Sequence, residues 1–329
     1  MKLCIRDINL ISKRLKILSK YCPREFNRKP RCLKDFNDYK ATEFRQFALY
    51  TGPVVMYGIL PNDGYLHYLL FHAALRSISQ KNSSTIYQRF AEIALKEFVD
   101  KCPQFYKLSF ISYNVHALLH FVPDVERFGP LDSFSAFKYE NNVAFFRKIY
   151  RKPSLPLQQI ALRLAEMEQL EQVVPNTEHT IKVSVLHDNG PILPELGFVY
   201  MQYRKMQMKN MFIGIDFDGD KCCILNDSSI CVVYNILKTQ YNMYYFIIKK
   251  FKTVNAFYDI GILSTCLGIY KCSNLYSKYE VISIDDVKQK CYLMPYWSRE
   301  ESELLVSDSS DNENTEEPSN NIFIAAVII

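Results

Sequence analysis

The sequence has 329 residues, of which 48% are apolar and 23% are charged. These proportions are ordinary for a globular chain with a buried core, and they exclude a disordered or fibrous protein. The formal net charge is +5, but residues 1–45 hold 13 basic and 5 acidic side chains, whereas residues 299–320 hold 1 and 8. The basic excess favours a polyanion such as nucleic acid through counterion release, although a solvated basic surface accounts for it equally well.

Residues 1–18 are the first predicted element. Their apolar side chains recur at helical spacing and are interrupted by charges, which is typical of an amphipathic helix and not of a signal peptide. The ten cysteines show no regular framework, so reduced thiols are expected. No apolar run reaches the ~18 residues of a membrane span. The sequence therefore predicts a nuclear or cytoplasmic protein that is not secreted and has no membrane partner.

Helical spacing predominates up to about residue 171 and is broken by proline and glycine. The predicted helices are residues 8–20, 41–60, 64–80, 84–101, 115–127, 136–151 and 156–172. Gly52 and Pro53 are expected to kink or split the second of them.

Beyond Pro175 the period changes to that of short strands separated by turn-forming residues. The expected strands are residues 198–203, 208–213, 230–237, 244–251, 267–271, 279–282 and 289–294. They predict a small antiparallel β barrel or sandwich. The predicted fold class is therefore α+β, with an all-helical N-terminal part, this β part and then a disordered acidic tail.

The polar, acidic stretch from residue 298 to 321 cannot form a core. Ser307, Ser309 and Ser310 lie among its acidic residues as candidates for phosphorylation, while an unmodified solubilising tail is an equal alternative. The last eight residues, IFIAAVII, are apolar and β-prone. They are either an added strand or an artefact of the gene model.

His116 and His120 stand four residues apart and Asp124 follows one helical turn later, so all three can share one helix face. This spacing can bind a metal ion, but the glutamate of a zinc-protease motif is missing beside His116. The apolar neighbours favour instead core histidines that bond to adjacent helices.

Asp216, Asp218 and Asp220 imitate the start of a calcium loop, but Lys221 and Asp227 stand where such a loop needs Gly and Glu. A turn is therefore the preferred interpretation. No paired CxxC spacing indicates zinc, and no phosphate-binding glycine loop or nucleophile elbow is recognisable. The sequence thus gives little support to a hydrolase or a nucleotide-binding protein.

The stretch YNVHALLHFVPDVERFGPLDSFSAFKYENN (residues 113–142), followed by RKPSLPLQQI, resembles the region after the catalytic core of CACTA-type (En/Spm) transposases. Upstream, YCPREFNRKPRCL and KATEFRQFALYTGPVV are similar to the approach to that region in animal elements. Downstream, LGIYKCSNL and KCYLMPY resemble the closing module of those proteins. The resemblance identifies the chain with the C-terminal region of an animal transposon-derived protein.

The resemblance implies four segments. Residues 1–60 correspond to the end of a truncated, basic and helical catalytic region, and residues 61–175 to the helical domain that follows it. Residues 176–297 form the β-rich module, and residues 298–329 the disordered acidic tail with an apolar end.

Transposases of this family cut and join DNA with an RNase H-like fold, in which three carboxylates hold two divalent metal ions. Glu43 opens a predicted helix, where a carboxylate ordinarily complements the helix dipole. The resemblance aligns Glu43 with the third metal ligand and implies that the other two lie upstream of this chain. One carboxylate cannot build the site, so no cofactor is expected for the chain alone, and Mg²⁺ or Mn²⁺ only as part of a complete transposase.

Three functions follow from this. The first is a catalytically incomplete, transposase-derived protein that binds DNA or chromatin, with a protein partner possible for the β module. The second is a subunit of a metal-dependent transposase or nuclease, and the third a non-functional remnant, which departures such as Lys138 and Tyr139 from the family pattern would suit. The basic candidates for phosphate contact are Arg24, Arg28, Lys29, Arg31, Lys34, Arg45, Arg147, Lys148, Arg151 and Lys152. The sequence leaves the oligomeric state open.

Overall fold

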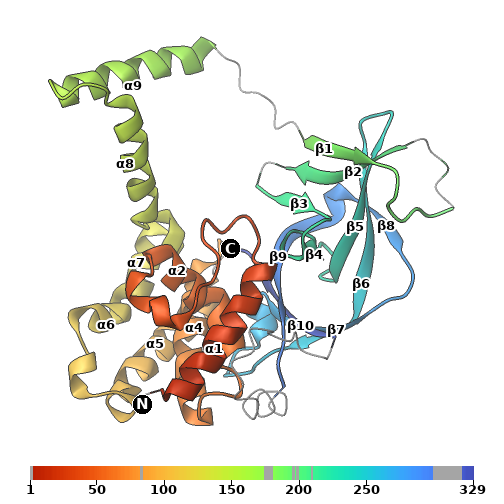
Figure 1. Cartoon of the computed structure of the whole chain (residues 1–329). Coiled ribbons are helices and arrows are strands. Elements are labelled where there is room, and N and C mark those ends of the chain that lie inside the picture. Colours follow the sequence, from red (N-terminus) through yellow and green to blue (C-terminus); the bar gives the residue numbers. More distant parts are fainter. Residues whose placement is uncertain are drawn as a thin grey trace.

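The computed structural model describes residues 3–81, 84–173, 181–194, 197, 200–208, 210–298 and 321–329. Within these ranges helices fill the N-terminal half and antiparallel strands the C-terminal half, as Figure 1 shows. The predicted α+β class is confirmed.

The helical half begins with α1, whose N-terminus is closed by Cys4 and Asp7 in a reciprocal cap. The helices are α1 (Ile5–Leu18), α2 (Ala41–Gln46), α3 (Gly52–Met56), α4 (Asn62–Ser79), α5 (Thr85–Phe105), α6 (Tyr113–Ala117), α7 (Phe121–Phe128), α8 (Phe137–Ile149) and α9 (Pro156–Val173). No helix in the described part of the chain is long and apolar enough to cross a membrane.

Two predicted helices are divided. The first, at residues 41–60, becomes α2 and α3 with a π-helical turn between them, and a side chain at Gly52 would collide with the Tyr68 hydroxyl. The division expected at Gly52 and Pro53 is therefore confirmed. The second was predicted as one continuous helix over residues 115–127. This prediction is wrong, because the range is divided into α6, a 3-10 turn and α7. Pro123 has no amide proton for the preceding turn, so α7 begins afresh at Phe121 with the proline in its first turn.

The strands of the second half are β1 (Lys182–His187), β2 (Tyr200–Gln207), β3 (Phe212–Gly214), β4 (Cys222–Leu225), β5 (Ile230–Thr239), β6 (Tyr244–Ala256), β7 (Ile269–Leu275), β8 (Glu280–Ser283), β9 (Val287–Pro295) and β10 (Ile322–Val327). Each of the seven predicted strands corresponds to one of them. The sequence did not predict β1 and β4.

The strand pairings are antiparallel and join two sheets through two long strands. β6 pairs first with β5 and then with β7, while β9 pairs first with β4 and then with β10. The pairings of β5, β4, β9, β10, β7 and β6 therefore run in a closed circuit, to which β1, β2, β3 and β8 are added at the sides. The sequence had left a barrel and a sandwich open, and the structure shows two sheets that share strands.

β10 lies between β7 and β9, with Ile324, Ala325 and Ala326 fully buried. Of the two interpretations of the last residues, the added strand is the one that fits. The predicted tail of residues 298–329 must therefore be shortened. Its acidic part, with the candidate phosphorylation sites Ser307, Ser309 and Ser310, lies outside the described residues.

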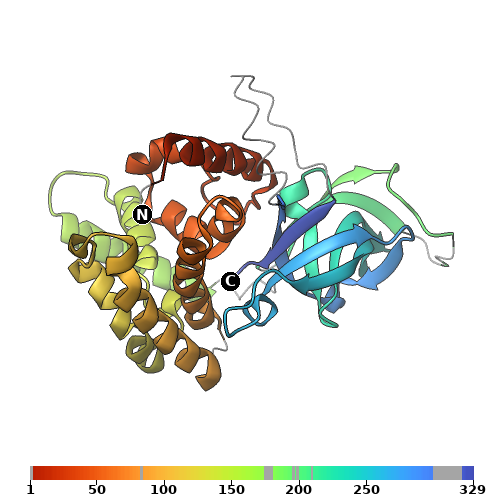
Figure 2. The ribbon, with the colours of Figure 1, turned by 90° about the horizontal axis from the view of Figure 1, so that it is seen from below.

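The helical and β halves share one hydrophobic core. It combines side chains of α1, α3 and α4 with side chains of β7, β9 and β10, and the Tyr292 hydroxyl donates to the Leu18 carbonyl at 2.8 Å. Figure 2 shows the helices on one side, the strands on the other, and the C-terminal strand where the two meet. The chain changes from helices to strands between residues 172 and 197, as predicted. The hydrophobic core nevertheless contains side chains from both sides of this boundary.

Arg76 joins the two halves from α4. Its buried guanidinium donates to the carbonyls of Leu49, Leu267 and Val327 at 2.9 to 3.0 Å and lies over the Tyr50 ring. Burial lowers the pKa of this arginine. Its donors satisfy carbonyls of three segments, which fixes β10 against the helices.

Candidate nucleic-acid interface

The predicted DNA-contacting residues differ sharply in their surroundings. Arg24, Arg31 and Arg45 each form an ion pair within the chain, with Asp220, Glu43 and Asp132 respectively. The other seven are exposed and form no ion pair with any described residue: Arg28, Lys29, Lys34, Arg147, Lys148, Arg151 and Lys152. The charges of this second group are therefore not neutralised by another described residue and can contact a partner.

Glu43 is buried, with 3% of its side chain exposed, and both of its carboxylate oxygens are engaged. Arg31 Nε donates to Oε1 at 2.5 Å and Arg31 Nη2 to Oε2 at 2.9 Å, while the Lys40 amide also donates to Oε2 at 2.9 Å. Burial raises the pKa of this carboxyl group, but the bonds from Arg31 and Lys40 outweigh it, so the pKa lies below its ordinary value.

This arrangement gives Glu43 a complete structural role. A bidentate arginine fixes the loop that precedes α2, and the carboxylate caps that helix. A metal ion at Glu43 would have to displace Arg31 from at least one oxygen. Nothing in the geometry requires the catalytic role that the resemblance implies.

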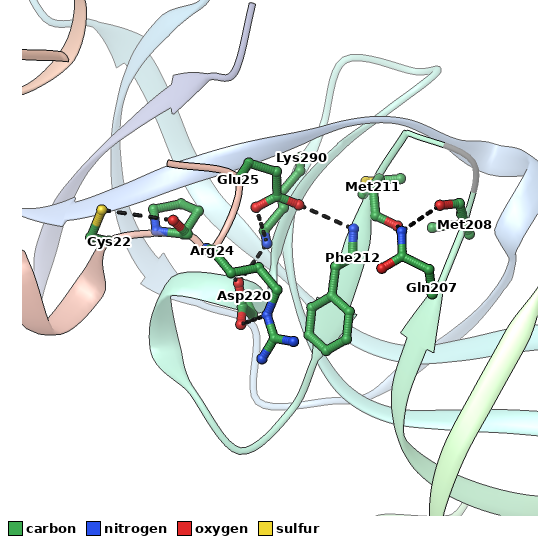
Figure 3. Close-up of polar contacts among 10 residues, drawn as sticks. Cys22, Arg24, Glu25, Gln207, Met208, Met211, Phe212, Asp220 and Lys290 are labelled. Atoms are coloured by element: carbon green, nitrogen blue, oxygen red, sulfur yellow. Dashed lines mark hydrogen bonds and ion pairs between the residues drawn. The ribbon is translucent and has the colours of Figure 1, made fainter. Parts of the chain in front are cut away.

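A second set of charges attaches the N-terminal loop to the β part, as Figure 3 shows. Lys290 Nζ lies 2.6 Å from Asp220 Oδ1 and 2.7 Å from Glu25 Oε2, and Arg24 Nε donates to Asp220 Oδ2 at 3.0 Å. Glu25 also accepts from the Phe212 amide at 3.1 Å. The side chains of Lys290 and Asp220 are only 3% and 1% exposed, so the centre of this cluster is buried, whereas Arg24 is half exposed.

Arg24 is consequently oriented by its neighbours. Its guanidinium carbon lies 3.4 Å from the centre of the Phe212 ring, and its backbone amide donates to Asp220. A side chain fixed by a carboxylate and an aromatic face has little freedom to follow a phosphate backbone. We therefore assign Arg24 to the attachment of the loop.

The remaining cations form two groups. Arg28, Lys29 and Lys34 lie between α1 and α2, and Arg28 lines a small hollow with the start of α8. The other group lies where α8 meets α9, and Figure 1 shows these two helices extending away from the rest of the helical half.

The elbow between α8 and α9 contains a hollow of about 850 Å³. Arg151, Lys152 and Arg163 line it, together with polar and apolar side chains of α9. Arg163 is paired with Glu166 at 2.7 Å, whereas Arg151 and Lys152 have no such partner in the described chain. Gln159 fixes the elbow, because its amide nitrogen donates to the Lys152 carbonyl at 2.9 Å and its oxygen accepts from the Lys152 amide at 3.2 Å.

The predicted histidine site is not formed as expected. His116 lies in α6 and His120 ends the 3-10 turn between α6 and α7; their ring centres are 5.4 Å apart, and both are exposed. The interpretation as core histidines is therefore wrong, because the proline in α7 interrupts the helix that would have buried them. Among the described residues, the buried histidines are His67 and His72 on α4.

Asp216, Asp218 and Asp220 form a turn, as predicted, but they do not share a ligand position. Asp216 pairs with Arg204 and Asp218 with Lys221, while Asp220 belongs to the buried cluster. Across the described ranges no three or more His, Cys, Asp or Glu side chains are arranged to hold a metal ion.

Comparison with known proteins identifies only the β part. Residues 186–307 match a family model described as Domain of unknown function (DUF8592). The match begins within β1 and includes strands β2 to β9. No curated protein and no solved structure matches the chain.

Proposed function

We propose that this chain is a transposase-derived DNA-binding protein that lacks a complete catalytic centre of its own. The observation that supports it is the basic elbow, defined by Arg147, Lys148, Arg151 and Lys152. These four exposed cations lie at the end of α8 and in the connection to α9, the two helices that project in Figure 1, and they have no carboxylate partner in the described chain. Uncompensated cations on a projecting element suit the DNA backbone, whose affinity for proteins comes from released counterions.

The test is a titration of fluorescent duplex DNA at several salt concentrations. Changing the four elbow residues to Gln removes four possible phosphate contacts. The slope of log K against log salt should then become less steep by about 3 to 4. A matched control changes four exposed lysines of the β part to Gln, namely Lys182, Lys252, Lys278 and Lys288.

Two results would overturn the proposal. Affinity that does not change with salt would exclude binding through phosphates. An equal loss of affinity in the elbow variant and the β-part control would show that only total charge matters.

The alternative function is a metal-dependent nuclease subunit in which Glu43 binds a metal. The bidentate pairing of Glu43 with Arg31 speaks against it. Labelled DNA should remain intact with Mg²⁺ or Mn²⁺ for the natural chain and for Glu43→Gln alike. Cleavage that is lost specifically in Glu43→Gln would replace our proposal with this alternative.

A further inference from the structure

Two phenylalanines between α1 and α3 leave about half of their side chains exposed. Phe36 lies in the 3-10 helix Leu33–Asp38 and is 53% exposed, and Phe44 lies in α2 and is 48% exposed. Enclosed aromatic rings contribute strongly to the stability of a core, and these two rings make only part of that contribution. They remain available for contact with a partner.

Tyr39 connects the two phenylalanines. Its ring centre lies 5.3 Å from that of Phe44, with the ring planes at 54°, and its amide donates to the Phe36 carbonyl at 3.2 Å. The three residues therefore belong to one compact part of the surface. We call Phe36, Tyr39 and Phe44 the aromatic patch.

The ring of Tyr39 is fixed by the ion pair of Glu43. The Tyr39 hydroxyl donates to the Arg31 carbonyl at 2.5 Å, and the Arg31 guanidinium carbon lies 5.2 Å from the centre of the ring. Arg31 is in turn paired with the buried Glu43. The ring that contacts Phe44 is thus held in place before a partner binds, which reduces the entropic cost of binding.

Cations without a carboxylate partner lie next to the aromatic patch. Lys34 precedes Phe36 by two residues, and Lys40 directly follows Tyr39. Both lysines are exposed, and neither forms an ion pair with any described residue. Residues 28–45 hold six basic and three acidic side chains in all, and this excess favours a polyanion.

We propose that the aromatic patch binds single-stranded nucleic acid, with unpaired bases stacked on its rings and phosphates beside Lys34 and Lys40. Proteins that hold single strands combine exposed rings with cations, because every base has a flat face and every nucleotide carries a phosphate. An acidic peptide would use the cations and leave the rings without a partner. The bases of a duplex are already stacked on each other, so this site is separate from the duplex contact proposed for the basic elbow and does not depend on it.

Fluorescence anisotropy of a labelled oligothymidylate of about twelve residues measures this contact. The four elbow residues are changed to Gln in every protein, so that the elbow does not contribute. Phe44→Ala should weaken binding about fivefold or more, whereas Phe44→Tyr keeps a ring and should remain within about twofold of the parent. The control Phe128→Ala removes a ring of α7 that is 50% exposed and should leave the affinity unchanged.

The salt dependence of the same binding tests the cations. Changing Lys34 and Lys40 together to Gln should make the slope of log K against log salt less steep by about 1.4, because two contacts with phosphates of a single strand are lost. The same change at Lys13 and Lys16, two exposed lysines of α1, should leave the slope as it is. Oligouridylate of equal length, measured in parallel, distinguishes RNA from DNA, because RNA alone offers the ribose 2′-hydroxyl.

A chain with its natural elbow separates this site from the elbow, because Phe44→Ala should leave its affinity for duplex DNA unchanged. Circular dichroism verifies that the variants keep their helices. The proposal is refuted if neither oligonucleotide binds, if Phe44→Tyr loses as much affinity as Phe44→Ala, or if Phe128→Ala has the same effect. Binding that needs the two lysines but not Phe44 would assign the surface to an acidic partner instead.

Discussion

Lys290 shows at the scale of single residues how a charge is kept in the interior. Its amine is enclosed by Asp220 and Glu25, and Arg24 compensates the second oxygen of Asp220. A buried ion pair stabilises the folded state little more than well-packed apolar side chains of the same volume would. Removing one partner, however, leaves the others desolvated and uncompensated.

Lys290→Met should therefore reduce the free energy of unfolding by about 3 kcal/mol or more. Urea denaturation measures this, and Lys288→Met, an exposed change on the same strand, is the control. Adding Asp220→Asn to Lys290→Met should recover part of the loss, because the uncompensated carboxylate disappears. Equal stability of the two single variants would contradict the role given to the cluster.

The buried histidines predict sensitivity to acid. His67 is stacked between Phe98 and Phe105, and burial lowers its pKa to about 4, while burial lowers the pKa of His72 to about 3. In the unfolded chain both titrate near 6.5. Below pH 6.5 the histidines are protonated in the unfolded state but stay neutral in the folded state. The free energy of unfolding should therefore fall as the pH decreases from about 6.5 to 4.

His67→Phe should make this decrease less steep, because a phenyl ring can occupy the stack without binding a proton. The measurement is the free energy of unfolding by urea at several pH values. His116→Phe, which changes an exposed histidine, should leave the pH dependence as it is. A variant at His67 that keeps the full dependence would show that other groups cause it.

At the scale of elements, local sequence was a good guide to helices and to most strands, because their apolar periods are set by neighbours in the chain. Local sequence failed to predict features that depend on contacts between residues far apart in the chain. The pairing of Lys290 joins residues 70 and 265 positions apart, and Glu43 could be placed at a helix start but not assigned its arginine. β4 has only four residues, all buried, and carries no alternation to recognise.

Substitutions in β10 should destabilise both halves, because this strand is hydrogen-bonded to β7 and to β9 and packs in the shared core. Ile324→Ala removes a fully buried side chain from the shared core and should lower the free energy of unfolding by about 2–5 kcal/mol. Ile322→Ala, at the more exposed start of the strand, should cost clearly less. Similar losses for both would place the terminal residues outside the core.

For the whole molecule, the shared core predicts that the helical and β halves unfold together. Trp297 is the single tryptophan and is buried beside Arg14 of α1, so its fluorescence reports on the junction. The far-ultraviolet circular dichroism reports on the helices. The two signals should follow one urea transition with the same midpoint, and separate midpoints would show that the halves are independent.

This union of the halves could not be read from the sequence. The change of period near residue 175 indicated two parts, and a pattern of that kind does not reveal which apolar faces meet. Leu18 and Tyr292, whose carbonyl and hydroxyl groups form a hydrogen bond between the halves, are 274 positions apart.

The place of β10 between β7 and β9 has a consequence for how the chain is made. Synthesis produces both neighbours before it produces β10, and until then each of them has an open hydrogen-bonding edge that could pair with another molecule. The eight acidic residues between positions 299 and 320 are made directly before β10. Clustered like charges beside an apolar, strand-forming segment disfavour pairing between chains that have not yet folded.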